Sequence, residues 1–154
     1  MIKADVLITN KDWKNYISNP NLYLKKKLKK VEKKITLLKK NKLSFNLLLS
    51  GSSEIRRLNK KFRKKNKTTD VLSFPNYTKK VLRALLKEPN KIYLGDIIIN
   101  LTKIIEKSQK QFFFVTFDKI WIHGLTHLLG YRHKSNRDFA EMQRLENRII
   151  KLVQ

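Results

Sequence analysis

Hydrophobic residues follow two different periods along the chain, and the change of period predicts where strands and helices lie. Short runs that alternate with polar residues, or are continuously apolar, are typical of strands. Pro75 should terminate one of these strands, because proline cannot donate a ladder hydrogen bond, and Asn100 should cap the helix that follows another. Strands are predicted at 4–9, where an edge position is expected, and at 43–50, 68–75 and 92–100.

Apolar residues at helical spacing predict a long amphipathic helix in the first quarter of the chain. A shorter helix should begin near Asp12 and be interrupted around Pro20. The basic outer face of the long helix could contact an acidic membrane or an RNA backbone. We favour a helix packed on a sheet, with RNA contact as an addition. Its buried stripe consists of Leu24, Leu28, Val31, Ile35 and Leu38, and lysines fill most other positions.

The remaining patterns predict helices interleaved with the strands. A turn at 51–54 should open a short helix ending near Phe62, followed by a basic loop at 60–67 that contains Arg63. An apolar helix is predicted at 117–129, and the aromatic residues 112–114 that precede it should be core. This interleaving predicts one α+β or α/β domain over residues 1–154. Ser135 should cap a last helix with an apolar face formed by Phe139, Met142, Leu145, Ile149 and Leu152.

Charge and composition narrow the class of partner. The 154 residues carry 36 Lys and Arg against 12 Asp and Glu, a net charge of +24, and 21 of the bases lie in residues 1–67. Such a surface attracts polyanions, so nucleic acid is the favoured partner, although compositional drift toward Lys, Asn and Ile explains the same excess. Without cysteine, disulfides and thiolate ligands are excluded. With neither a signal peptide nor a membrane span in the pattern, we expect a cytoplasmic protein.

The three histidines of the chain, His123, His127 and His133, all fall within eleven residues. On a helix, His123 and His127 would stand one turn apart on the same face, and both rings could reach a single ion. Gly130 could end the helix in a left-handed conformation and turn the chain so that His133 reaches the same point. Three neutral nitrogen ligands fit one zinc ion and leave its fourth position for water, which suggests catalysis.

Two other interpretations of the histidines stay open. Metzincin peptidases have similar spacing, but a glutamate follows their first histidine as general base, and here that position is Gly124. A peptidase would therefore need a carboxylate from elsewhere in the chain. The alternative without a metal is that the three histidines are unrelated core residues. Their joint spacing, with a glycine between them, disfavours this interpretation.

Several motifs, in order, resemble the YbeY family of bacterial endoribonucleases. The histidine stretch 123–133 is similar to that family's His-Gly-x-Leu-His-Leu-x-Gly-Tyr-Asp-His motif. The resemblance extends from about Leu43 to Leu152. Its other elements are Leu58-Asn59 with Phe62-Arg63, then Thr69-Asp70-Val71-Leu72-Ser73-Phe74-Pro75, Leu94-Gly95-Asp96-Ile97, and Ala140-Glu141-Met142 with Leu145-Glu146.

The resemblance implies a fold and an activity. The fold is α+β, a single domain with a mostly parallel four-stranded sheet and a central helix carrying the three-histidine metal site. The activity is that of a zinc-dependent, single-strand-specific endoribonuclease in small-subunit ribosomal RNA 3′-end maturation and ribosome quality control. Arg63 matches the family's functional arginine and would hold the scissile phosphate. The expected partners are ribosomal RNA, the small ribosomal subunit and its assembly factors, with no DNA and no membrane.

Two departures from the family pattern keep an alternative function open. Thr126 replaces a leucine between the first two histidines, and Arg132 replaces an aspartate before the last. If that aspartate orients a ligand or positions water, an arginine cannot replace it. A non-catalytic RNA-binding assembly factor with a structural zinc is therefore the alternative, and a zinc peptidase is a weaker one. Asp70 and Asp96 are expected to be structural acceptors, whereas Ser73 could face the site or satisfy the backbone.

Overall fold

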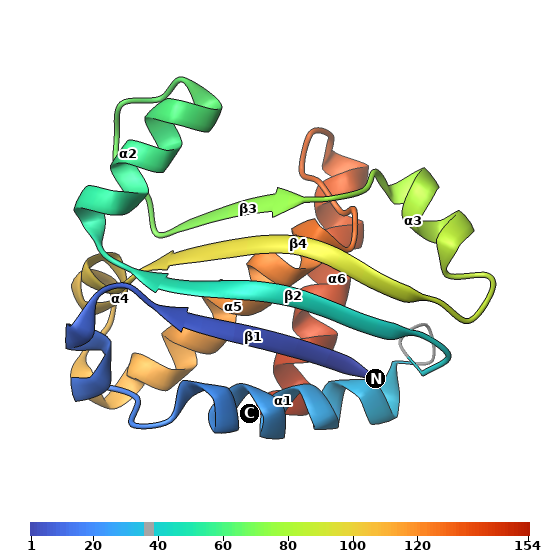
Figure 1. Cartoon of the computed structure of the whole chain (residues 1–154), viewed down its shortest axis with the longest axis horizontal. Helices are drawn as coiled ribbons and strands as arrows, with labels where there is room; N and C mark the ends of the chain where they lie inside the picture. Colours follow the sequence, from blue (N-terminus) through green and yellow to red (C-terminus); the bar gives the residue numbers. More distant parts are fainter. Residues whose placement is uncertain (36–38) are drawn as a thin grey trace.

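The computed structural model describes residues 1–35 and 39–154, which form one four-stranded sheet and its helices (Figure 1). None of the helices in this described part has the length and apolar character needed to cross a membrane. The strands are β1 (Ile2–Ile8), β2 (Lys42–Ser50), β3 (Val71–Pro75) and β4 (Lys91–Asn100), and the helices are η1 (Lys11–Asn15), α1 (Pro20–Lys34), α2 (Ser52–Arg63), α3 (Lys79–Leu85), α4 (Leu101–Lys107), η3 (Lys110–Phe112), α5 (Phe113–Leu128) and α6 (Asn136–Val153).

The sheet has the order β1-β2-β4-β3. β1 pairs with β2, and β2 with β4, in parallel, whereas β3 runs antiparallel to β4. Parallel neighbours need a crossover connection, and α1 supplies it between β1 and β2. The α+β fold, the mostly parallel four-stranded sheet and the edge position of the first strand are confirmed.

The two faces of the sheet differ in burial. Along β2, Phe45 and Leu47 are fully buried, whereas their neighbours Asn46 and Leu48 are half-buried. The buried face packs against helices, and Figure 1 shows α5 and α6 behind the sheet with α1 along its β1 side. On the opposite face, α2 contacts β3 and β4 through a small apolar cluster. One face of the sheet therefore carries the core, and much of the other stays open.

The helix caps and helix ends of the structure agree only in part with those predicted from the sequence. The side chains of Asn100 and Ser135 cap α4 and α6, as predicted. The shorter helix expected to begin near Asp12 is η1, which begins at Lys11. The side chain of Asn10 caps it by accepting a hydrogen bond from the Asp12 amide. Arg63 was expected in a loop, but it is the last residue of α2, which extends until Lys64 adopts a left-handed conformation.

The predicted apolar stripes are mostly buried. Along α1 the buried residues include Leu24, Leu28 and Val31, and Ile35 caps the helix, while Leu38 lies outside the described residues. Among the aromatic residues 112–114 only the middle one is core, because α5 starts there and turns its neighbours outward. Along α6, Met142 and Ile149 are buried, but Phe139 at the exposed start of the helix is not.

A buried carboxylate joins three helices. Asp118 on α5 accepts hydrogen bonds from Tyr23 of α1 at 2.9 Å and from Trp121 at 2.8 Å. Lys27 of α1 lies 2.9 Å from its second oxygen and also donates to the carbonyl of Val153 on α6 at 2.6 Å. Because the Asp118 side chain is 2% exposed, its charge depends on these partners.

Replacing Lys27 with Met should therefore lower the free energy of unfolding by about 3 kcal/mol, because it leaves the Asp118 charge buried and unpaired. Urea unfolding measures this loss. Lys26→Met is the matched control, since Lys26 is exposed on the same helix. Equal stabilities of the two variants would contradict the role given to Lys27.

Candidate metal centre

The position of α5 on the sheet sets where two of the histidines stand. His123 and His127 are one turn apart on α5, as the spacing predicts. Between them, Gly124 faces Ile97 of β4, and a Cβ atom there would lie only 2.7 Å from the Ile97 Cγ2. The missing side chain therefore lets the helix rest directly on β4, and both histidines come close to the sheet.

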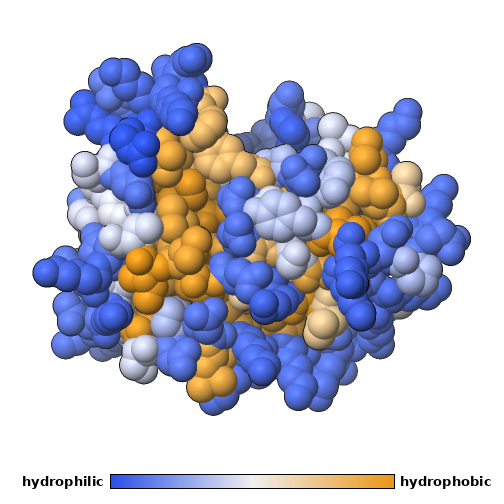
Figure 2. Space-filling model, viewed as in Figure 1, coloured by the Kyte–Doolittle hydropathy of each residue, from blue (hydrophilic) through white to orange (hydrophobic). Residues whose placement is uncertain are grey.

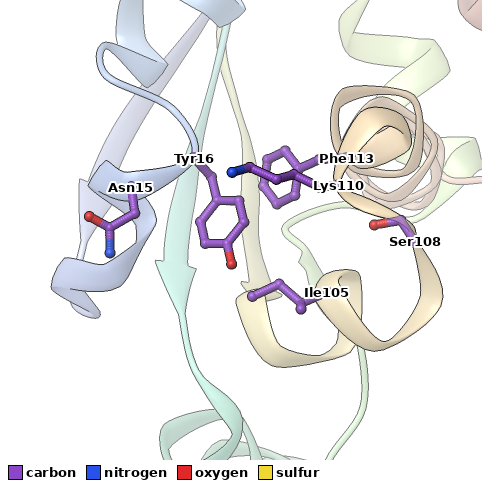
Figure 3. A pocket seen from close by; sticks show the side chains of 6 residues that line it. All are labelled: Asn15, Tyr16, Ile105, Ser108, Lys110 and Phe113. Carbon is purple, nitrogen blue, oxygen red and sulfur yellow. The ribbon is translucent and has the colours of Figure 1, made fainter.

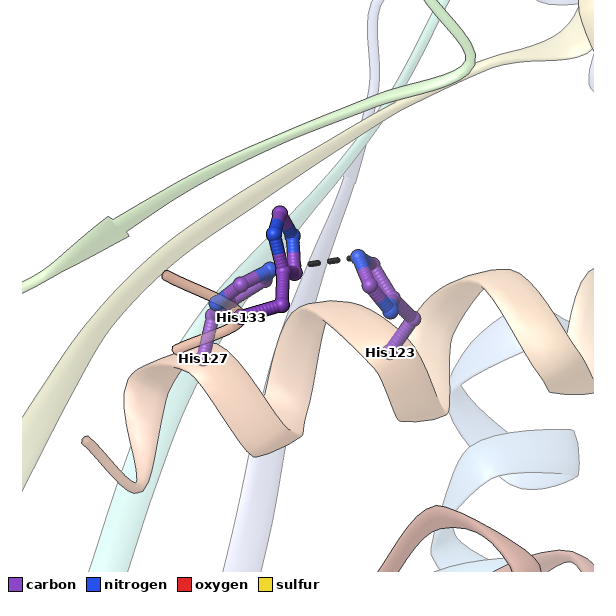
Figure 4. Close-up of side chains that lie close together, drawn as sticks. All are labelled: His123, His127 and His133. Carbon is purple, nitrogen blue, oxygen red and sulfur yellow. Dashed lines mark hydrogen bonds between the residues drawn. The ribbon is translucent and has the colours of Figure 1, made fainter. Parts of the chain in front are cut away.

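A glycine turn brings the third histidine to the other two. Gly130 has a φ of +88°, and its amide donates to the His127 carbonyl at 2.9 Å, which closes the end of α5. The chain then returns toward α5 at His133. The centroid of the His133 ring lies 5.1 Å from that of His127 and 6.0 Å from that of His123. Figure 4 shows the three rings together, and one nitrogen from each lies within 4.8 Å of the others.

Hydrogen bonds fix the orientation of two imidazole rings. His123 Nδ1 lies 2.7 Å from Glu146 Oε1, and His127 Nδ1 lies 2.9 Å from the Tyr131 carbonyl. Since both partners are acceptors, each Nδ1 donates its proton to that partner, and in a neutral ring Nε2 then carries the lone pair. The two Nε2 atoms, 3.1 Å apart, then face each other with lone pairs (Figure 4, dashed line). Such a contact is repulsive unless a proton or a metal cation lies between the two nitrogen atoms, so the donor set fits a metal ion.

The electrostatics of His127 favour the same state. Burial is the largest cause that lowers its pKa, to about 4. The ring is therefore neutral at pH 7, as metal coordination requires.

Two residues that support His123 were missed from the sequence. Glu146 comes from α6, and its Oε1 lies 3.2 Å from the hydroxyl of fully buried Thr126, which also donates to the His123 carbonyl at 2.7 Å. Thr126 therefore belongs to the hydrogen-bonded surroundings of His123. The signal for Glu146 was its place in the apolar stripe of the last helix, four residues after Met142 and three before Ile149.

Arg63, the last residue of α2, contacts β3, the outer strand of the sheet. Its Nη2 donates to the carbonyl of Ser73 on β3 at 3.1 Å, and the guanidinium carbon lies 5.8 Å from the centroid of the Phe74 ring. Ser73 is buried on the α5 side of β3, opposite Ile97. Its hydroxyl has no hydrogen-bond partner within the described residues. Ser73 therefore faces the side of the sheet that carries the histidine helix and does not satisfy the backbone.

The two aspartates of the motifs have structural partners. Asp70 pairs with Lys107, and Asp96 accepts hydrogen bonds from Asn46 and Tyr93. Partial burial raises the pKa of Asp70, but the hydrogen bond and charge of Lys107 outweigh it and hold this pKa below its usual range. Neither carboxylate belongs to the histidine cluster, the one such group found in the described residues.

Two other hollows add no residue to the histidine cluster. Arg132 is exposed and lines one of about 250 Å³ together with Lys79 and Tyr131. Figure 3 shows another, of about 230 Å³, whose lining includes Tyr16 of the η1 end, Ile105 of α4 and Phe113 of α5. It contains neither a histidine nor Arg63, so it is not the candidate site.

The fold and the site together define an α+β protein with a three-histidine group that could hold a metal ion. The family model described as "Endoribonuclease YbeY" matches residues 7–154. The chain is 38% identical over 162 residues to the Endoribonuclease YbeY of Pelagibacter ubique (strain HTCC1062), covering 99% of this chain and 97% of that protein. It is 34% identical to the protein of the same name from Prochlorococcus marinus (strain MIT 9215), over 96% and 81%. The chain belongs to the YbeY family.

A solved structure supports the fold. The solution structure of TM1509 from Thermotoga maritima superposes with a TM-score of 0.59 and covers 99% of this chain and 89% of that one. At 24% identity, this likeness concerns the fold alone.

Proposed function

We propose that this chain is a zinc-dependent endoribonuclease that cuts single-stranded RNA, with residues 1–154 forming its one domain. His123, His127 and His133 hold one zinc ion, and Arg63 binds the scissile phosphate. The proposed substrate is ribosomal RNA at the 3′ end of the small-subunit RNA, cut during maturation and in ribosome quality control. Its partners are then the small ribosomal subunit and assembly factors, and it works in the cytoplasm, where bacterial ribosomes mature.

One observation carries the metal assignment. The protons on His123 Nδ1 and His127 Nδ1 are committed to Glu146 and Tyr131, which leaves two Nε2 lone pairs 3.1 Å apart. That separation is close to the spacing of two nitrogen ligands on one tetrahedral ion. Membership of an endoribonuclease family supports RNA cleavage as the chemistry of the site.

The protein groups would share the work as follows. A zinc ion, when bound, supplies a Lewis acid for the phosphodiester. Glu146 keeps the His123 ring in the orientation that presents Nε2. The guanidinium of Arg63, anchored to the Ser73 carbonyl, retains donors that can hold a phosphate and the charge that grows on it in the transition state. The net charge of +24 would attract RNA before these contacts form.

One observation favours the second candidate, a non-catalytic RNA-binding assembly factor. Arg132 is exposed next to His133, where the family has an aspartate, and the hollow that it lines contains both Lys79 and Asp138. The Arg132 side chain can bind an RNA phosphate, but it cannot accept a proton from water as an aspartate could. The peptidase alternative gains nothing from the structure, because the carboxylate of Glu146 is engaged by His123 and Thr126.

Arg63→Ala should reduce cleavage of a labelled single-stranded RNA by about 100-fold, because a donor to the transition-state charge is lost. Its zinc content should remain that of the wild type. His127→Ala should lose both zinc and cleavage. Cleavage rates and zinc per chain are measured on the same preparations. Arg57→Ala is the matched control, since Arg57 is exposed on the same helix, and it should keep both.

Arg132→Asp separates the two candidate functions. If the wild type binds zinc and cleaves RNA, the endoribonuclease proposal stands. If the wild type binds zinc but cuts RNA only after Arg132→Asp, the chain is an assembly factor that has lost its chemistry. Loss of zinc from Arg63→Ala would instead make Arg63 a structural residue.

Glu146→Gln should weaken zinc binding by about 10- to 100-fold, because the amide keeps the shape of the side chain but loses the charge that orients His123 and makes it more basic. Competition with a chromophoric chelator measures the affinity. Glu141→Gln is the control. Glu141 lies on the same helix but pairs with Lys79 at 2.8 Å instead of with a histidine, so its zinc affinity should not change. Equal zinc affinity of the two variants would show that Glu146 does not support the metal.

A further inference from the structure

An apolar groove lies on the open face of the sheet, beside α2. It has a volume of about 350 Å³, at the lower end of the range for small-ligand sites. Figure 2 shows apolar side chains gathered in a band beside α2 and over the strands, with hydrophilic residues around it. The lining includes Leu7 of β1, Leu48 of β2, Phe74 of β3, Ile98 of β4 and Phe62 of α2.

Large apolar side chains on two sides of this groove are exposed to solvent. Phe62 is 57% exposed, and its ring packs edge-on against that of Phe74, with the centroids 5.3 Å apart. Leu7, across the groove, is 58% exposed. Large apolar side chains grouped on a surface mark a binding face more often than singly scattered ones do.

Cations lie over both rings. Lys61 Nζ is 5.2 Å from the centroid of Phe62, and the guanidinium of Arg63 is 5.8 Å from that of Phe74. Asp96, the one acid of the lining, is hydrogen-bonded to Asn46 and Tyr93. Aromatic faces interleaved with cations suit a flexible polyanion that carries planar groups, which describes single-stranded nucleic acid.

Arg63 connects this groove with the proposed active site. It holds the Ser73 carbonyl on β3, and the Ser73 side chain faces the α5 side of the sheet, whereas Phe74 faces the groove. A phosphate bound by Arg63 would therefore have its neighbouring nucleotide within reach of Phe74 and Phe62. Because a duplex keeps its bases stacked inside, only a single strand could place a base there.

We infer that Phe62 and Phe74 form a stacking subsite for an unpaired base that neighbours the phosphate held by Arg63. This inference rests on the proposed function and adds a physical basis for single-strand preference. The charge of +24 disfavours a second copy of the chain as the occupant of this groove.

The test is fluorescence anisotropy with a labelled single-stranded oligoribonucleotide and with an abasic oligomer of the same length, in chelator so that nothing is cleaved. Phe62→Ala should weaken binding of the RNA about tenfold and leave the abasic oligomer unchanged, because one base-stacking contact is lost. Phe62→Leu, which retains apolar packing on Phe74, should behave like the alanine variant, and Phe62→Tyr should bind like the wild type.

Phe112→Ala is the matched control, since Phe112 is 51% exposed in η3, outside the groove, and it should bind both oligomers normally. Equal RNA binding by Phe62→Ala and wild type would overturn the stacking subsite and leave the proposed function standing. An equal loss for both oligomers would overturn it too, as would a wild-type dimer that Phe62→Ala dissociates in sedimentation velocity. Failure of the wild type to bind RNA at all would overturn both the subsite and the proposed function.

Discussion

The close approach of α5 to β4 is the constraint on which the candidate site depends. A helix packed on a sheet is normally held away by its own side chains, but at Gly124 the nearest Ile97 carbon would already lie 2.7 Å from a Cβ atom. Any larger residue would have to push the helix or Ile97 aside. The absence of a side chain at Gly124 therefore has two consequences. It removes the general base found in peptidases with similar spacing, and it seats both histidines against the sheet.

The site is completed by contacts from other elements. Glu146 of α6 contacts His123. Gly130, which packs against the backbone of Lys79, turns the chain so that His133 returns toward α5. The two Nε2 atoms are held face to face by partners on the far side of each ring. The protein thus holds the two Nε2 atoms in the arrangement that one cation needs.

Much of the fold was predictable because local rules and tertiary contacts agree. Asn100 and Ser135 cap the helices that their positions predict, and the histidine spacing gives the correct face of α5. The contacts that come from distant parts of the chain were harder to predict from the sequence. Glu146 contacts His123 because α6 packs on α5. Arg63 contacts Ser73 because α2 extends as far as Arg63. Phe62 and Phe139 follow apolar patterns but are exposed, since periodicity does not say which faces remain uncovered.

The most direct test of this account is a crystal structure of the zinc-loaded protein with anomalous data collected at the zinc absorption edge. The account predicts one anomalous peak about 2.0–2.1 Å from the Nε2 atoms of His123 and His127 and from a nitrogen of His133, with Glu146 still on His123 Nδ1. A zinc peak elsewhere, or coordination through His123 Nδ1 with Glu146 displaced, would contradict it.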